Sequence, residues 1–191
     1  MSESGTFEPD GRAVPYAVEG EGPVTLVLLA AGGVEGDGLG VIAHYLAEEA
    51  GFRVARVGSR SGSDASGTSV ADRVADTVDV TDHLGITHTW VGGHAFGGTI
   101  AREFAAAHHE RVNGLLLMGV EESQAPLAPA IPVLIIQGSD DDVTPPENGE
   151  QLRMTAPERS SVTTLDGAGH HFPATHPIET AVIIEEYLDW D

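Results

Sequence analysis

Short apolar runs and longer amphipathic segments alternate along almost the whole chain, and this alternation constrains the fold more than any other feature. The run Val24 to Leu29 is continuously apolar, which is typical of a strand buried on both faces of a sheet. The segment Val70 to Leu84 instead repeats its apolar residues at helical spacing. Strands that alternate with helices predict a mostly parallel sheet with helices on both faces.

The boundaries of the expected elements follow from where each pattern starts and stops. Expected strands run from Val24 to Leu29, Phe52 to Val57, Thr87 to Val91, Gly114 to Met118, Pro132 to Gln137 and Ser161 to Leu165. Expected helices run from Val41 to Ala50, Val70 to Leu84, Gly98 to His108, Glu147 to Thr155 and Ile178 to Trp190. The leading segment, Thr6 to Glu19, is expected to form a hairpin that adds antiparallel to one edge of the sheet. Because 191 residues suffice for one core but not for two, we expect a single α/β domain over residues 1–191.

The charge of the chain is strongly negative, and this excludes several classes of partner. Thirty acidic residues oppose nine basic residues, all of them arginine, which gives a formal net charge of -21. No nucleic acid and no anionic membrane surface is expected as a partner, because both are bound through positive charge. The lack of lysine excludes Walker-type phosphate loops and Schiff-base chemistry, and the lack of cysteine excludes disulfides and thiolate zinc sites.

Neither a leader peptide nor a membrane span is visible in the sequence. The first residues, Met1-Ser-Glu-Ser-Gly-Thr, lack the basic and apolar regions of a secretion signal. No apolar run reaches about 18 residues. We therefore expect a cytoplasmic protein, and the sequence leaves its oligomeric state open.

Three loops follow predicted strands and carry the residue types that chemistry needs. They are Gly92 to Gly98, Gly138 to Pro145 and Gly167 to His171. Ligands of such sheets bind where the strands end at their carboxyl edge. In the first loop, small residues two positions either side of Ala95 permit a tight turn from strand to helix, with the central side chain exposed at the helix N-terminus.

These loops resemble the α/β-hydrolase family, and the resemblance runs through nearly the whole chain. Gly93-His94-Ala95-Phe96-Gly97 is similar to the nucleophile elbow Gly-x-Ser-x-Gly, with Ala95 in the place of the serine. Gly138, Asp141 and Pro145 match Gly-x-x-Asp-x-x-x-Pro, and Gly167-Ala168-Gly169-His170 matches Gly-x-Gly-His. The resemblance implies a sheet of about eight strands and a triad made of the position of Ala95, the acid Asp141 and the base His170.

The resemblance also implies what each of these residues does. His170 would take a proton from a serine hydroxyl and return it to the leaving group, and Asp141 would hold the imidazole in the right tautomer. Backbone N–H groups of Gly32 and Phe96 would form the oxyanion hole, at about 3 kcal/mol per donor. Gly33, His94 and Phe96 are expected to contact the substrate. The expected activity is hydrolysis of an ester or thioester of a small molecule, with no organic cofactor and no metal.

Ala95 has no nucleophilic atom, and three explanations of it fit the sequence. An engineered replacement of serine would trap substrate. A natural alanine would belong to a protein that binds its ligand without turnover, or to a lyase or isomerase that uses His170 and the oxyanion hole. A third possibility is that His94, or a water activated by His170, replaces the serine. Loss of a triad serine costs on the order of 10⁶ in turnover, so the chain is expected to be nearly inert as a serine hydrolase.

Two further departures from the family concern the surroundings of the site. Leu29-Ala30-Ala31-Gly32-Gly33 stands where the family has its His-Gly oxyanion loop, so this loop is expected to have a different shape. About a dozen residues separate the strands Gly114 to Met118 and Pro132 to Gln137, where the family inserts its cap domain. We therefore expect a cap-less domain with an open site.

Two other interpretations compete with a hydrolase site. Gly33-x-x-Gly36-x-Gly38 resembles a phosphate-binding turn, and Arg56 and Arg60 after the next strand could meet the 2′-phosphate of a dinucleotide. A metal site could form from the neighbouring carboxylates 140–142 together with His170, His171 and His176. We favour one functional aspartate, Asp141, flanked by two solvated ones.

Overall fold

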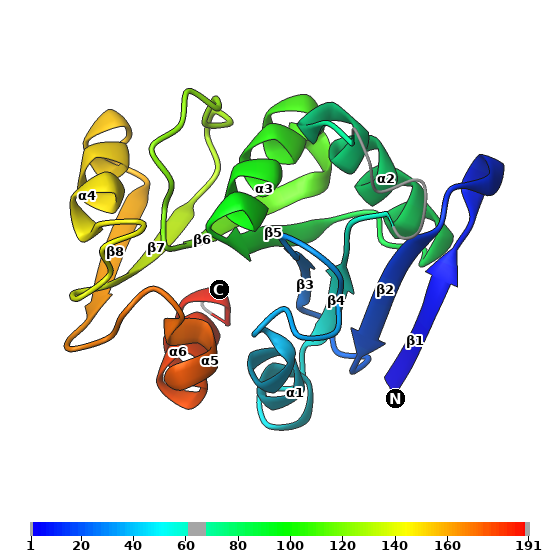
Figure 1. Ribbon diagram of the computed structural model, residues 1–191, viewed down its shortest axis with the longest axis horizontal. Coiled ribbons are helices and arrows are strands. Elements are labelled where there is room, and N and C mark those ends of the chain that lie inside the picture. Colours follow the sequence, from blue (N-terminus) through cyan, green and yellow to red (C-terminus); the bar gives the residue numbers. More distant parts are fainter. Residues whose placement is uncertain (1, 61–67, 190–191) are drawn as a thin grey trace.

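An eight-stranded sheet forms the centre of the molecule in the computed structural model, which describes residues 2–60 and 68–189. The strands are β1 (Ser2–Phe7), β2 (Val14–Glu19), β3 (Thr25–Leu29), β4 (Arg53–Val57), β5 (Thr89–His94), β6 (Val112–Met118), β7 (Val133–Gly138) and β8 (Ser160–Leu165). Their order is β1-β2-β4-β3-β5-β6-β7-β8 (Figure 1). The pairs β1–β2 and β2–β4 are antiparallel, and all the others are parallel. The predicted α/β fold with a mostly parallel sheet of eight strands is confirmed.

Helices cover both faces of this sheet, as Figure 1 shows. They are α1 (Gly40–Glu48), α2 (Val70–His83), α3 (Phe96–Ala107), α4 (Pro146–Thr155), α5 (Phe172–Thr175) and α6 (Pro177–Leu188). One apolar cluster joins α2, α3 and α4 to the sheet and includes the fully buried Ile100 and Phe104. A second cluster joins α1, α5 and α6 to the opposite face and includes Leu46, Phe172 and Ile184. The site described below lies where the parallel strands of this two-sided core end.

Several element boundaries differ from those expected, and each difference has a local cause. Strand β5 continues through Gly92 and Gly93 to His94, beyond the expected end at Val91, because its last residues still pair with β6 up to Met118. A Cβ on Gly92 would lie 2.3 Å from the carbonyl oxygen of Leu116, so this glycine serves close packing rather than a turn. The predicted helix from Gly98 begins earlier, at Phe96.

The two ends of the domain also differ from expectation. The edge strand β1 begins at Ser2 rather than Thr6, in a polar stretch without an apolar pattern. The last helix ends at Leu188, and Trp190 lies outside the described residues. The polar stretch 58–69 is likewise described only at its two ends.

The connection between β6 and β7 bears on how the site is covered. Residues 119–132 contain no helix or strand, so nothing there forms a cap domain. Within the described part of the chain, no helix has the length and apolar character needed to cross a membrane.

Candidate active site

The turn between β5 and α3 holds Ala95 in a backbone conformation that is unusual for a residue with a side chain. Its φ is 53° and its ψ is -116°. Such geometry costs on the order of 1–3 kcal/mol and persists only where the surroundings impose it. Glycine allows the turn to close here: a Cβ on Gly93 would lie 2.4 Å from the carbonyl carbon of Gly97. Gly93 is therefore required because the backbone of Gly97 packs against it.

The same turn brings the start of α3 against the end of β3. A Cβ on Gly97 would lie 2.1 Å from the carbonyl oxygen of Leu29, so only glycine allows this approach. The amide of Phe96, in the first turn of α3, has no acceptor inside its own helix. The loop after Leu29 and the first turn of α3 are thus close neighbours, and Gly32 and Phe96 both line the pocket described below.

Asp141 and His170 meet behind this turn, from the loops after β7 and β8. The Nδ1 atom of His170 lies 3.1 Å from Oδ2 and 3.2 Å from Oδ1 of Asp141. The side chain of Asp141 is fully buried and that of His170 is 16% exposed. With Nδ1 directed at the carboxylate, Nε2 is the ring nitrogen left for proton transfer.

Thr144 completes the environment of the carboxylate. The Thr144 hydroxyl donates to Oδ2 of Asp141 at 2.6 Å, while the amides of Thr144 and Val143 donate to Oδ1 at 2.8 and 2.9 Å. Burial acts to raise the pKa of Asp141, but the hydrogen bonds from Thr144, from His170 and from the Val143 amide outweigh it, and the pKa is lowered. Asp141 is consequently a carboxylate near neutral pH.

His94 lies against His170 and links the elbow to the loop after β8. The centroids of the two rings are 4.7 Å apart, and Nε2 of His94 lies 2.8 Å from the carbonyl oxygen of His170. Because that acceptor requires a proton on Nε2, the ring donates from this atom. Burial lowers the pKa of His94 to about 4, and the nearby charge of His170 adds to the effect. His94 is therefore neutral at physiological pH and acts as a fixed donor.

A pocket of about 760 Å³ opens above these groups. Ala95, Phe96 and His170 line it together with Gly32 and Gly33. Its lining also includes four carboxylic residues, namely Glu35, Asp37, Glu121 and Glu122, and among the described residues no arginine lines it. The pocket thus places His170, Gly32 and Phe96 beside acidic side chains.

The structure brings the sequence-predicted site residues together. Gly32, Gly33, His94, Ala95, Phe96 and His170 line one pocket, and Asp141 contacts His170 from behind it. Two residues were missed. Thr144 follows Asp141 at a spacing typical of side-chain capping in a turn, which was an available signal. Glu121 receives a hydrogen bond of 2.7 Å from the Thr99 hydroxyl, and nothing in the sequence pattern marked this contact.

Neither competing interpretation of the site gains support from the geometry. Arg56 lies 3.1 Å from Asp37, and Arg60 binds Asp76 at 2.8 Å, so both guanidinium groups are engaged by carboxylates rather than presented to a phosphate. No group of three or more metal-ligating side chains is found over residues 2–60 and 68–189.

Comparisons with known proteins give a consistent result. A profile of the alpha/beta hydrolase family matches residues 34–174. A crystal structure of a membrane phospholipase A, a bacterial virulence factor, matches with a TM-score of 0.84 and 18% identity over 98% of this chain and 86% of that one. An alpha/beta hydrolase from the metagenome of Mar Chica lagoon sediments matches with a TM-score of 0.80 and 22% identity over 98% of both chains. A thermophilic esterase from Thermogutta terrifontis matches with a TM-score of 0.82 and 18% identity, covering 99% of this chain and 98% of that one.

Proposed function

Because the chain belongs to the alpha/beta hydrolase family, we propose that its pocket binds an ester or thioester of a small molecule, and that hydrolysis is the activity of the form with serine at position 95. The observation that carries this proposal is the intact pair of Asp141 and His170 beside an elbow whose strained backbone is kept at Ala95. With alanine there, the chain holds its ligand and hardly turns it over.

The reaction of the serine form follows from the positions of the groups. The serine oxygen at position 95 attacks the carbonyl carbon while its proton passes to Nε2 of His170. The amides of Gly32 and Phe96 donate to the oxygen that becomes negative. His170 then gives its proton to the departing alcohol or thiol, which leaves an acyl-serine. Water cleaves that ester by the same steps, and Asp141 stabilises the imidazolium each time.

The rim of the pocket favours one class of acyl compound. Glu35, Glu121 and Glu122 place negative charge around the entrance, which repels anions. Neutral or cationic esters are therefore proposed as ligands, in preference to those with a phosphate or a free carboxylate close to the acyl bond. Residues 119–132, between β6 and β7, form no cap domain that would cover the entrance of the pocket.

The test compares this chain, Ala95→Ser, and the double variant Ala95→Ser/His170→Ala on p-nitrophenyl acetate and butyrate. We expect hydrolysis and labelling by a fluorophosphonate in Ala95→Ser alone, because only that variant has both a nucleophile and a base. Labelling is read as a mass increase, which does not depend on the choice of ester. An Ala95→Ser variant that neither hydrolyses nor labels overturns the proposal. Equal turnover with and without the serine would instead indicate a lyase or isomerase that relies on His170.

A further inference from the structure

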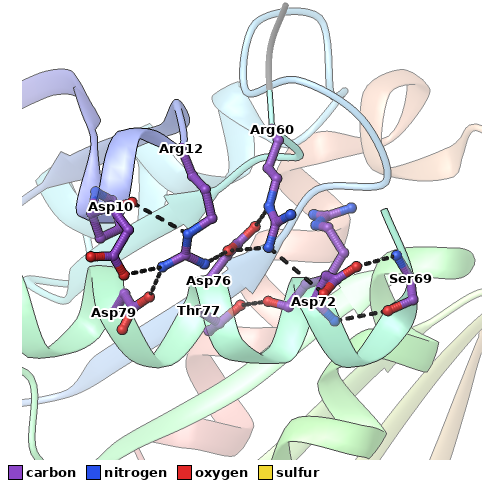
Figure 2. A network of polar contacts seen from close by, with 10 residues as sticks. Asp10, Arg12, Arg60, Ser69, Asp72, Asp76, Thr77 and Asp79 are labelled. Atoms are coloured by element: carbon purple, nitrogen blue, oxygen red, sulfur yellow. Dashed lines mark hydrogen bonds and ion pairs between the residues drawn. The ribbon is translucent and has the colours of Figure 1, made fainter. Parts of the chain in front are cut away.

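Helix α2 carries a row of charged side chains beneath the N-terminal hairpin, shown in Figure 2. Asp76, at the centre of the row, is fully buried. Its Oδ1 accepts from Arg12 at 2.5 Å and from Arg60 at 3.0 Å, and its Oδ2 accepts from Arg60 at 2.8 Å. Arg12 and Arg60 therefore satisfy this buried carboxylate. A third arginine, which lies on α2 itself, makes its hydrogen bonds elsewhere.

That third arginine, Arg73, is 3% exposed and directs its guanidinium at the loop after β3. Its Nη2 donates to the carbonyl oxygen of Ala30 at 2.5 Å, and its Nη1 makes a longer contact of 3.4 Å with the carbonyl oxygen of Ala31. Its Nε is buried and has no hydrogen-bond partner among the described residues. A buried cation with an unsatisfied donor is costly, so this placement needs a reason beyond stability.

The direction of these bonds fixes the direction of two amides. In a trans peptide the C=O and the N–H point to opposite sides, and the described chain contains no cis peptide bond. When Arg73 holds the carbonyl of Ala30, the amide of Ala31 must point away from Arg73. The carbonyl of Ala31 also faces Arg73, so the amide of Gly32, in the same peptide group, points away from Arg73 as well. Ala31 and Gly32 line the pocket, whereas Arg73 is buried on α2.

The loop has no side chains that could fix these peptide groups by themselves. Its residues are Ala30, Ala31, Gly32 and Gly33, and a Cβ added at Gly32 or Gly33 would find nothing within 4 Å. Glycine also leaves the backbone free to adopt several conformations. The carbonyl oxygen of Gly32 accepts a hydrogen bond from the Ser59 amide at 2.9 Å, which holds the peptide that follows Gly32. The Ala30 amide donates to the Val57 carbonyl at 3.0 Å, and the carbonyls of Ala30 and Ala31 are held by Arg73.

We propose that Arg73 is a positioning residue that holds the peptide groups 30–31 and 31–32 with the N–H groups of Ala31 and Gly32 directed into the pocket, so that the oxyanion donors are set before a substrate arrives. The catalytic consequence rests on the proposed function, but the orientation of the peptides does not. Preset donors are the most effective ones, because they need no reorganisation when charge develops.

The first experiment measures the loop without any activity. In ¹⁵N-labelled chain with Ala95 in place, backbone order parameters at Ala31 and Gly32 should be near the rigid value of about 0.85 and should fall below about 0.6 in Arg73→Met. Arg111→Met is the matched control, because Arg111 also donates to a backbone carbonyl, that of Ile86 at 2.9 Å, but far from the loop. Unchanged order parameters in Arg73→Met overturn the inference.

Arg73→Lys covers the case in which Arg73→Met does not fold. Lysine keeps the charge but cannot present two donors as a rigid fork. We therefore expect an intermediate loss of order at Gly32 in a folded protein, and full order there would contradict the inference.

The second experiment adds Arg73→Met to the Ala95→Ser variant. We expect kcat to fall about tenfold to a hundredfold with KM changed by less than about twofold, because donors that act on the transition state affect kcat. An unchanged kcat, or a loss confined to KM, overturns the inference while Ala95→Ser stays active. If Ala95→Ser is itself inactive, the proposed function fails, and the order parameters still decide the role of Arg73.

Discussion

His94 makes the stability of the domain depend on pH, because the fold keeps this histidine neutral well below its ordinary pKa. The folded state holds its pKa at about 4, against an ordinary value of 6.5. Burial is the main cause, the charges of His170 and His171 act in the same direction, and Asp141 and the His170 carbonyl oppose it. As the pH falls below 6.5, His94 of the unfolded chain binds a proton, whereas His94 of the folded chain stays neutral until about pH 4. The free energy of unfolding is therefore lost as the pH falls from 6.5 towards 4.

The size of the effect follows from the two pKa values. Each pH unit between them corresponds to about 1.36 kcal/mol, so the full window is equivalent to about 3 kcal/mol. At about pH 5, still above the isoelectric point of 4.5, the His94 contribution is about 2 kcal/mol of lost unfolding free energy relative to about pH 8.

Urea unfolding of the chain and of His94→Gln at several pH values isolates this contribution. Glutamine keeps an N–H donor for the His170 carbonyl but does not titrate, and the other histidines are common to both proteins. We expect the unfolding free energy of His94→Gln to fall less between about pH 8 and pH 5, by about 2 kcal/mol. Parallel pH profiles for the two proteins would refute the reasoning, whatever their absolute stabilities.

Two further substitutions test the packing of the elbow and of the α2 network. Gly97→Ala should lower the unfolding free energy in urea by at least about 2 kcal/mol, because its Cβ would lie 2.1 Å from the Leu29 carbonyl oxygen. Gly32→Ala is its control, since nothing lies within 4 Å of a Cβ there, and equal effects of the two would contradict the packing argument. Asp76→Ala should cost about 3 kcal/mol in the same assay, because it leaves Arg12 and Arg60 without their buried carboxylate. Glu186→Ala, at an exposed position of α6, should shift the unfolding free energy by less than about 0.5 kcal/mol, and similar shifts in both variants would argue against a structural role of the network.

The fold could be predicted from the sequence because its strands are buried on both faces. A strand such as β3, with four fully buried residues in a row, must be continuously apolar, and this pattern survives in the sequence. The edge strand β1 needs no such pattern, since most of its residues are exposed, and its start at Ser2 could not be predicted. Gly92 misled for another reason: it indicates a turn in the sequence but serves close packing of β5 against β6.

The candidate site could be predicted only for residues that lie within short sequence motifs. The order of Ala95, Asp141 and His170 is visible along the chain, and the structure places them at one edge of the sheet. The contact of Arg73 with the carbonyl of Ala30 joins residues 43 positions apart. No periodicity marks it, because Arg73 lies on an otherwise ordinary amphipathic helix. Contacts of this kind depend on how α2 packs against α3 and β2, which is a property of the assembled fold.

The backbone of the elbow has a consequence for how this protein could change over generations. Its unusual dihedral angles at Ala95 are allowed by the glycines around it, which leave room for the turn to close. Serine differs from alanine by a single oxygen, so it should enter this turn at almost no loss of folding stability. Every alanine codon is also one base away from a serine codon. Gain of a nucleophile therefore requires one nucleotide change and no repacking, and selection for ester hydrolysis from a library of random single mutations should recover position 95 first.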